Sequence, residues 1–379
     1  MKTYDVIVIG GGFLGVSTAY HLARTGARTL LLEAGDIGSG TSGSCSGRAQ
    51  VCEGHLDPLN IFLVREGLAR HNSLEEELGF DYEWRRAGLF LLLPNEESER
   101  LWRRRCEVLS AEGIPTQIVD CATLRAAEPF LRTEGLVGAV YASEGTLNPL
   151  RFVHAYAQAA MRCGADVRRN SPVIGMDVQG SKVLAVHTAQ EVLGAGAVAV
   201  MAGAWESVVT SMAGVDTPIT HTHAEAFVTE SIPAMIHNNI GVADSYDTIY
   251  GKERGVAIGI VPEVNGTLVI SEAVTRTDEL HQRTSAWGLE AMATQSVRLF
   301  PFLEKVRVMR TWGRPTSIAP DEEPVVGWLP QLDNLFVATS LLETISALPV
   351  LSEWMAMMIQ GQEPPMALDL YSPARFWTR

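Results

Sequence analysis

Three glycines near the N-terminus, Gly10, Gly12 and Gly15, have the spacing of a loop that binds a dinucleotide. In such a loop the first glycine permits a tight turn, the second lets backbone N–H groups approach a pyrophosphate, and the third lets a helix pack closely on a strand. The start of the following helix, near Leu14, adds positive partial charge that attracts phosphate. Glu33 can accept a hydrogen bond from the adenosine ribose, and its carboxylate would repel a 2′-phosphate, which disfavours NADP. This pattern predicts dinucleotide binding but does not separate FAD from NAD.

A second candidate for chemistry is a run in which His221, His223 and Glu225 alternate along a predicted strand. Residues two apart on a strand share a face, so these three side chains are expected to point the same way. Imidazole and carboxylate groups are metal ligands, so the set suits a metal site. It also suits the polar floor of a substrate pocket or a plain solvated face, and the spacing does not decide among the three.

The elements that position these residues alternate between strands and helices. Around the glycines we expect a buried strand at 4–9, an amphipathic helix at 13–24 that stops at Gly26, and a second strand at 27–32. A small polar stretch at 38–47 follows. The remaining pattern predicts helices at 58–78, 96–112, 149–163, 279–300 and 345–360, strands at 88–93, 173–178, 182–187, 324–328 and 334–338, a small-residue strand and glycine turn within 195–205, and a strand-rich stretch at 217–271.

The composition excludes several classes of protein. The 379 residues include 30 Lys and Arg against 44 Asp and Glu, a net charge of −14 that argues against nucleic-acid binding. No apolar run approaches the roughly 20 residues needed to span a bilayer, and the first strand runs into glycines rather than into a signal-peptide cleavage site. Five cysteines without a CxxC pair argue against disulfides, zinc or an internal iron–sulfur cluster. We therefore expect a reduced, cytoplasmic enzyme without a bound metal.

Taken together, four segments resemble the D-amino acid oxidase superfamily of FAD-dependent amine oxidoreductases. They are DVIVIGGGFLGVSTAYHLARTGARTLLLE at 5–33, GTLNPLRFVHAYAQAAMRCGADV at 145–167, AVMAGAW at 199–205 and TWGRPTSIAPDEEPVVGWLPQLDNLFVAT at 311–339. The resemblance implies an α/β fold with a Rossmann-like FAD-binding domain and an inserted strand-rich α+β substrate domain. The FAD-binding domain would comprise 1–80, 141–217 and 308–379, and the substrate domain 81–140 and 218–307.

The resemblance also implies FAD as cofactor and assigns the residues that hold it. The pyrophosphate would lie at the glycine loop, the ribose at the end of the second strand, the adenine at a mid-chain strand, and the flavin beside the small polar loop, the AVMAGAW turn and the last turn. In that order the residues are Gly10, Gly12, Leu14 and Gly15; Glu33 and Ala34; Val173; and Thr41, Ser42, Ala202, Gly203, Trp205 and Leu342.

The implied reaction moves a hydride from the substrate α-carbon to the flavin, so the protein mainly orients the substrate. A carboxylate anchor is then needed, and arginine suits it because its planar guanidinium pairs with a carboxylate through two hydrogen bonds. Arg314 matches the family position of this anchor, with a structural ion pair as the alternative. Arg48 matches an arginine position used by some members, Tyr250 lies where family aromatics cap the substrate, and His223 falls in the amine-binding pocket.

One turn departs from the family pattern. After the strand DNLFVAT the family has a glycine-rich turn beside the flavin, whereas this chain has Ser-Leu-Leu-Glu-Thr at 340–344. Such a turn normally stabilises negative charge on reduced flavin through backbone N–H groups or a helix dipole. Bulky leucines and the anionic Glu343 leave three outcomes open: an altered active site, a site completed by a partner, or loss of the cofactor.

The leading hypothesis is an FAD-dependent dehydrogenase or oxidase of a small amino acid or secondary amine, such as a D-amino acid, glycine, sarcosine, hydroxyproline or an opine. The altered turn and the segment HAEAFVTE at 223–230 favour the flavin-bearing subunit of a heteromeric dehydrogenase. Its partners would be a second flavoprotein or a [2Fe–2S] subunit. Two alternatives stay open: an NAD-dependent dehydrogenase, and a degenerate flavoprotein that serves as a non-catalytic assembly subunit.

Overall fold

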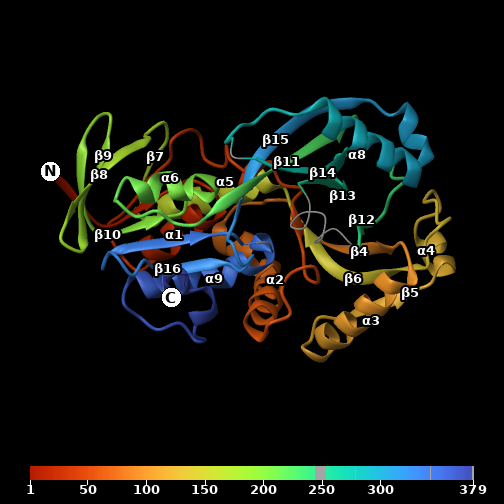
Figure 1. Cartoon of the computed structure of the whole chain (residues 1–379), viewed down its shortest axis with the longest axis horizontal. Coiled ribbons are helices and arrows are strands. Elements are labelled where there is room, and N and C mark those ends of the chain that lie inside the picture. The colour runs from red at the N-terminus through yellow and green to blue at the C-terminus, as the bar shows by residue number, and fades with distance from the viewer. Residues whose placement is uncertain (244–252, 278, 342, 378–379) are drawn as a thin grey trace.

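The computed structural model describes residues 1–243, 253–277, 279–341 and 343–377 (Figure 1). The helices are α1 (Phe13–Arg24), α2 (Pro58–Leu78), α3 (Glu96–Ala111), α4 (Cys121–Ala127), α5 (Pro149–Arg162), α6 (Glu206–Ser211), α8 (Ala286–Leu299) and α9 (Thr344–Ile359). The strands are β1 (Lys2–Ile9), β2 (Thr29–Leu32), β3 (Arg48–Ala49), β4 (Arg85–Leu93), β5 (Thr116–Val119), β6 (Gly138–Thr146), β7 (Asp166–Arg168), β8 (Val173–Gln179), β9 (Lys182–Thr188), β10 (Val192–Val200), β11 (Thr220–Thr229), β12 (Asn239–Val242), β13 (Arg254–Pro262), β14 (Leu268–Arg276), β15 (Val308–Ile318), β16 (Val325–Trp328) and β17 (Leu335–Thr339).

The first sheet has the strand order β16-β17-β10-β1-β2-β7, with β9 and β8 added beside β10. Strands β17, β10, β1, β2 and β7 run parallel, so their carboxyl ends meet at one edge. Side chains alternate along β1: Val6 and Val8 pack into the core formed with α1, α2, α5 and α9, while Ile7 and Ile9 pack into the core on the other face. This two-sided burial explains the nearly continuous apolar runs of these strands.

The second sheet, at the right of Figure 1, has the order β15-β11-β14-β13-β12-β4-β6-β3, with β5 beside β6. It is largely antiparallel, and β12 pairs with β4 in parallel. Helix α8 packs against β14 and β13, and its Met292 is fully buried in the core of this sheet. The result is the mixed α/β architecture that the sequence predicts, with a strand-rich region added to a doubly wound one.

Helix α9 contains Pro349, which removes the hydrogen bond that the carbonyl of Ile345 would otherwise accept. The Nε2 atom of the buried His71 on α2 lies 2.9 Å from that carbonyl oxygen and replaces the missing donor. Burial lowers the pKa of His71 to about 4, so the ring stays neutral and its Nδ1 accepts a hydrogen bond from the hydroxyl of Tyr82 at 3.1 Å. Helix α9 is therefore held at its N-terminal turn, which faces the cavity described below.

Element boundaries follow the sequence closely in most places and differ most at one helix. Helices α1 and α2 have the predicted ends, whereas the helix predicted at 279–300 begins only at Ala286. The side chain of Ser285 caps this helix by accepting a hydrogen bond from the backbone N–H of Gly288 at 2.9 Å. The division into domains stays a prediction; β15, which we assigned to the FAD-binding part, pairs with β11 in the second sheet.

Glu206, the first residue of α6, offers a test of how the buried carboxyl groups affect stability. It is fully buried, it accepts a hydrogen bond from the Thr217 hydroxyl at 2.6 Å, and its Oε1 atom has no partner. Burial raises its pKa from 4.5 to about 7. The folded state thus binds more protons than the unfolded state between these values, and stability falls as the pH rises through this window, by about 3 kcal/mol for this group.

We expect Glu206→Gln to raise Tm relative to the unchanged protein at pH 8 and to change it little at pH 5, because glutamine retains an acceptor for Thr217 and cannot ionise. Thermal denaturation at both pH values measures this difference. Glu112→Gln, at an exposed position, is the matched control and should show no pH-dependent difference. An equal Tm difference at pH 5 and pH 8 for Glu206→Gln would contradict the assigned ionisation.

Candidate functional site

A cavity of about 820 Å³ lies where the carboxyl ends of the parallel strands of the first sheet meet one face of the second sheet. The first sheet contributes the turn after β1 at 10–12, Glu33 after β2, Met201 after β10 and Thr339 at the end of β17. This edge is where open α/β sheets bind their ligands, and the volume lies within the roughly 300–1,000 Å³ of small-molecule sites.

The glycine loop leaves no room for side chains. Gly10 has a φ of +116°, and a Cβ there would lie 2.3 Å from the carbonyl oxygen of Met201. A Cβ on Gly15 would lie 1.9 Å from the carbonyl oxygen of Gly10, so only glycine lets α1 approach β1 this closely. Residues 10–12 consequently line the cavity with bare backbone, and the N–H of Gly10 donates to the carbonyl of Leu32 at 2.9 Å.

Glu33 lies beside this loop and holds its backbone. One carboxylate oxygen accepts a hydrogen bond from the N–H of Gly11 at 2.7 Å, and the other accepts one from the N–H of Gly35 at 2.7 Å. At the start of α1 the N–H of Phe13 donates to the hydroxyl of Ser42 at 3.0 Å. The bare backbone, the helix start and the adjacent carboxylate together fit a dinucleotide.

Most of the residues predicted to hold the cofactor line this cavity. Those on its wall are Gly10, Gly12, Leu14, Glu33, Ala34, Thr41, Ser42, Val173, Ala202, Gly203 and Trp205. Gly15 lies behind the wall, where it sets the distance between α1 and β1. Leu342 and Tyr250 lie outside the described residues.

Arg314, on β15, lines the cavity and has no ion pair within the described part of the chain. Its Nη1 donates to the carbonyl of the neighbouring Gly313 at 2.7 Å, and its buried Nε has no hydrogen-bond partner. Burial lowers its pKa, and the positive charge of Arg310 lowers it further. A cation with unused donors in a cavity is suited to bind an anion.

Arg48 also lines the cavity, but its guanidinium is already paired. Its Nε donates to Glu144 at 2.7 Å and its Nη2 donates to Glu53 at 2.6 Å. Glu144 is fully buried and accepts a further hydrogen bond from the Asn239 amide at 2.7 Å. Both partners hold Arg48 in a buried ion-pair network through its Nε and Nη2, which supports a structural role, and only its Nη1 has no hydrogen bond with a described residue.

The alternating set on β11 does not face the cavity as a unit. Glu225 lines the cavity together with Thr222, Ala224 and Ala226, while the Nε2 of His223 lies 2.7 Å from the carbonyl oxygen of Arg283. Burial lowers the pKa of His223, so the neutral ring donates its Nε2 proton to that carbonyl. His223, predicted in the amine-binding pocket, is thus held on the other face of the strand.

Glu225 and His221 complete that set. The Glu225 carboxylate accepts hydrogen bonds from the N–H and the hydroxyl of Ser285, at 2.8 and 2.7 Å, and so supports the N-terminus of α8. His221 is partly buried, and its Nε2 has no partner. Within the described ranges, no group of three or more His, Cys, Asp or Glu side chains is arranged to hold a metal ion.

The turn that departs from the family pattern brings Glu343 to the cavity wall. Its carboxylate accepts hydrogen bonds from the Asn60 amide at 3.0 Å and from the N–H of Glu53 at 3.2 Å. Burial raises its pKa, and the bond from Asn60 opposes this. Ser340 takes a left-handed φ of 60°, so the turn adopts a conformation that favours glycine without containing one.

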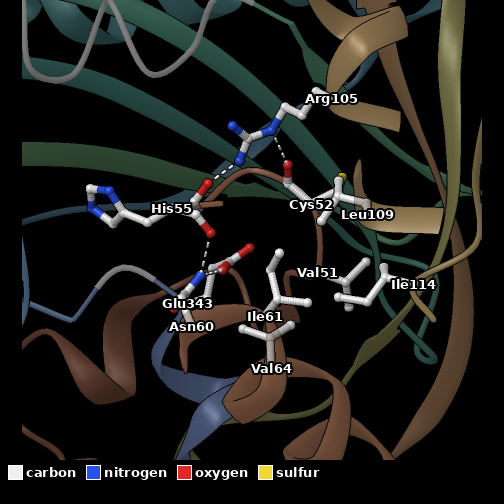
Figure 2. Close-up of a pocket in the computed structure, with 11 residues that line it drawn as sticks. Val51, Cys52, His55, Asn60, Ile61, Val64, Arg105, Leu109, Ile114 and Glu343 are labelled. Atoms are coloured by element: carbon white, nitrogen blue, oxygen red, sulfur yellow. Dashed lines mark hydrogen bonds between the residues drawn. The ribbon is translucent and has the colours of Figure 1, made fainter. Parts of the chain in front are cut away.

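Figure 2 shows the hydrogen bonds that hold the loop between Cys52 and His55, which lies next to Glu343. Arg105, on α3, donates to the backbone carbonyls of Cys52, at 2.7 Å, and of Gly54. Asn60, on α2, donates to the carbonyl of His55 at 2.9 Å as well as to Glu343. The carboxylate of Glu343 is therefore satisfied by the protein and directed into this loop.

Several cavity residues were not singled out from the sequence. Among them are Glu53, Glu272, Gln282 and Ser317. Glu272 carries a visible signal, since it is the one charged residue within the apolar stretch LVISEAV on a predicted strand. A charge in such a stretch is rarely buried without a reason. The other three have no comparable signal in the sequence.

Comparison with known proteins agrees with this geometry. The sequence pattern of a family described as FAD dependent oxidoreductase matches residues 5–357. The chain is 29% identical to mitochondrial sarcosine dehydrogenase of Mus musculus, with 89% of this chain and 37% of that protein aligned. It is 24% identical to sarcosine oxidase subunit beta of Rhodobacter capsulatus, with 89% of this chain and 80% of that protein aligned.

Among solved structures, glycine oxidase of Geobacillus kaustophilus superimposes with a TM-score of 0.90 at 24% identity, covering 99% of both chains, and so shares the fold. The chain spans about 37% of the length of the mouse sarcosine dehydrogenase. In the described part of the chain, every helix is too short or too polar to cross a membrane.

The glycine loop generates a prediction about cofactor content. We expect Gly15→Ala to lower stability by about 1–3 kcal/mol through overpacking and to reduce the FAD retained on purification, because the new methyl group would push α1 away from β1. The ratio of flavin to protein absorbance measures retention. Gly175→Ala is the matched control, since its new methyl group would meet only ordinary contacts, and it should retain FAD. Full retention in Gly15→Ala would show that the close approach is not required.

Proposed function

The chain belongs to the family of FAD-dependent oxidoreductases, and from this premise we propose that it oxidises the C–N bond of a small amino acid or secondary amine. FAD, when bound, supplies the acceptor for the hydride that leaves the substrate α-carbon. The candidate substrates are D-amino acids, glycine, sarcosine, hydroxyproline and opines. The names of the relatives, sarcosine dehydrogenase and sarcosine oxidase subunit beta, support an amine with a carboxylate.

The observation that carries this proposal is Arg314, a cavity arginine with unused donors and no counter-ion in the described chain. A substrate carboxylate would supply both the negative charge and the acceptors that this side chain lacks. The carboxylate would bind through charge-assisted hydrogen bonds, which fix orientation as well as affinity. Arg314 would thereby hold the α-carbon at one place in the cavity.

The cofactor would be held by other residues that line the same cavity. We assign the pyrophosphate to the backbone of Gly10 and Gly12 and the start of α1, and the ribose to Glu33. Thr41 and Ser42, and the turn at Ala202, Gly203 and Trp205, would enclose the flavin end, with Val173 at the adenine end. The N-terminus of α9 also faces the cavity, and its partial positive charge would stabilise an anion there.

We further infer that the chain is the flavin-bearing subunit of a heteromeric dehydrogenase. The support is its similarity to sarcosine oxidase subunit beta, a protein whose name makes it one subunit among others. The partners proposed are a second flavoprotein or a [2Fe–2S] subunit. The five cysteines are unpaired, in keeping with the cytoplasmic location that stays a prediction.

The first experiment is an absorbance spectrum of the purified chain followed by anaerobic titration with a panel of amino acids and N-substituted amino acids. We expect oxidised-flavin bands that bleach with one class of amine, because bound FAD is the electron acceptor. A flavin that no amine bleaches would contradict the proposed reaction. Rapid oxygen turnover by the chain alone would contradict the subunit role and leave the reaction standing.

Arg314 gives a sharper test. We expect Arg314→Met to lower kcat/KM about 10²–10³-fold, since removing one partner of a desolvated charge pair costs about 2–5 kcal/mol. Arg314→Lys should recover part of this loss because it retains the charge but not the two-bond geometry. Arg310→Met, on the exposed part of the same strand, is the matched control and should stay within about 3-fold of the unchanged enzyme. An unchanged kcat/KM in Arg314→Met would rule out Arg314 as the group that binds the substrate carboxylate.

A further inference from the structure

The charged side chains that line the cavity differ in whether other described residues satisfy them. Arg48 is occupied by Glu53 and Glu144. Glu343 is satisfied by the Asn60 amide and by the N–H of Glu53. One further carboxyl group, that of Glu272, lines the same cavity and has no hydrogen bond or ion pair with any described residue. Among the described residues, the carboxylate of Glu272 is thus left without a partner.

Glu272 lies on β14, where the pairing with β11 shifts register between Glu225 and Ala226. This irregularity places Glu272 on the cavity side, in the same wall as Val274 and Ser271. Burial raises its pKa to about 7; the nearby Glu53 raises it further and Arg48 lowers it. An unpaired carboxylate in such surroundings is strongly stabilised by a cation that binds next to it.

Arg314 and Glu272 stand on opposite sides of β11. Ala224 pairs with Arg314 of β15 on one side and with Val274 of β14 on the other. Two strand spacings separate β15 from β14, about 10 Å at the backbone. Between them β11 contributes Thr222, Ala224, Glu225 and Ala226 to the cavity wall, and the small side chains of the two alanines leave room for a ligand to cross the strand.

Arg314 does not close this gap. Its Nη1 is bonded to the carbonyl of Gly313, the residue before it, so the guanidinium stays near its own strand. The α-amino group of an amino acid is one carbon away from its carboxylate. A substrate whose carboxylate is bound by Arg314 can therefore reach Glu272 only with a second nitrogen that lies several bonds from that carboxylate.

We propose that Arg314 and Glu272 form a two-point charge reader for substrates that carry a second positively charged nitrogen, several bonds from the carboxylate. The class comprises basic amino acids and their N-substituted derivatives, which include opines of basic amino acids. Glu272 binds the remote cation and Arg314 binds the carboxylate, with the aliphatic part of the substrate lying over Ala224 and Ala226. This inference rests on the proposed function and narrows its substrate class.

The test compares ornithine with norleucine, which has a methyl group where ornithine has its terminal ammonium. Dissociation constants are measured on the anaerobic FAD-loaded protein by calorimetry, with both enantiomers of each compound. In the unchanged protein we expect ornithine to bind about 30-fold more tightly, the size of a hydrogen bond to a charged group. Glu272→Gln should reduce this ratio to near one while leaving the dissociation constant of norleucine unchanged.

Glu263→Gln is the matched control. Glu263 directly follows β13, in the turn that leads to β14. Its pKa is also raised by burial to about 7, and it does not line the cavity. It should keep the 30-fold preference. Equal binding of ornithine and norleucine by the unchanged protein, or an unaltered preference in Glu272→Gln, would overturn the charge reader.

The binding readout separates this inference from the proposed function. A preference for ornithine that depends on Glu272, together with a flavin that no amine reduces, would refute the oxidation and support the charge reader. Flavin reduction by norleucine and ornithine with equal dissociation constants would support the oxidation and overturn the charge reader.

Discussion

The close approach of helix α1 to strand β1 is the constraint on which the rest of the site depends. Without side chains at Gly10 and Gly15 the helix begins directly against the strand, and its first residues, Phe13 and Leu14, line the cavity. Glu33 can then reach the N–H of Gly11 from the neighbouring strand. Any larger residue at Gly15 would move the helix, and the part of the cavity wall formed by the glycine loop would move with it.

The two arginines that line the cavity differ in whether buried carboxylates pair with them. Arg48 is fixed between Glu53 and Glu144, so it links β3 and β6 to the adjacent loop and gives the wall its shape. Arg314 keeps unused donors on the face of the second sheet. Removing Arg48 would leave the carboxylates of Glu53 and Glu144 without their cation, which supports a structural role for this ion-pair group.

The turn without glycine is accommodated by its neighbours. Ser340 adopts the left-handed conformation itself. The Asn60 amide and the N–H of Glu53 both donate hydrogen bonds to the buried carboxylate of Glu343. His71 replaces the donor that Pro349 removes from α9. Helix α9 thus keeps its N-terminus at the cavity in spite of the buried carboxylate of Glu343 and the proline at position 349.

The sequence by itself determined the elements around the glycines, because turn geometry and apolar periodicity are local properties. It also indicated the family and the cavity position of Arg314. Only the tertiary structure decided that Arg48 is paired and that His223 faces away from the cavity, since both depend on residues far along the chain, Glu144 and Arg283. The lack of a hydrogen bond or ion pair between Glu272 and any described residue is likewise a tertiary property, because it depends on which side chains the folded chain brings near it.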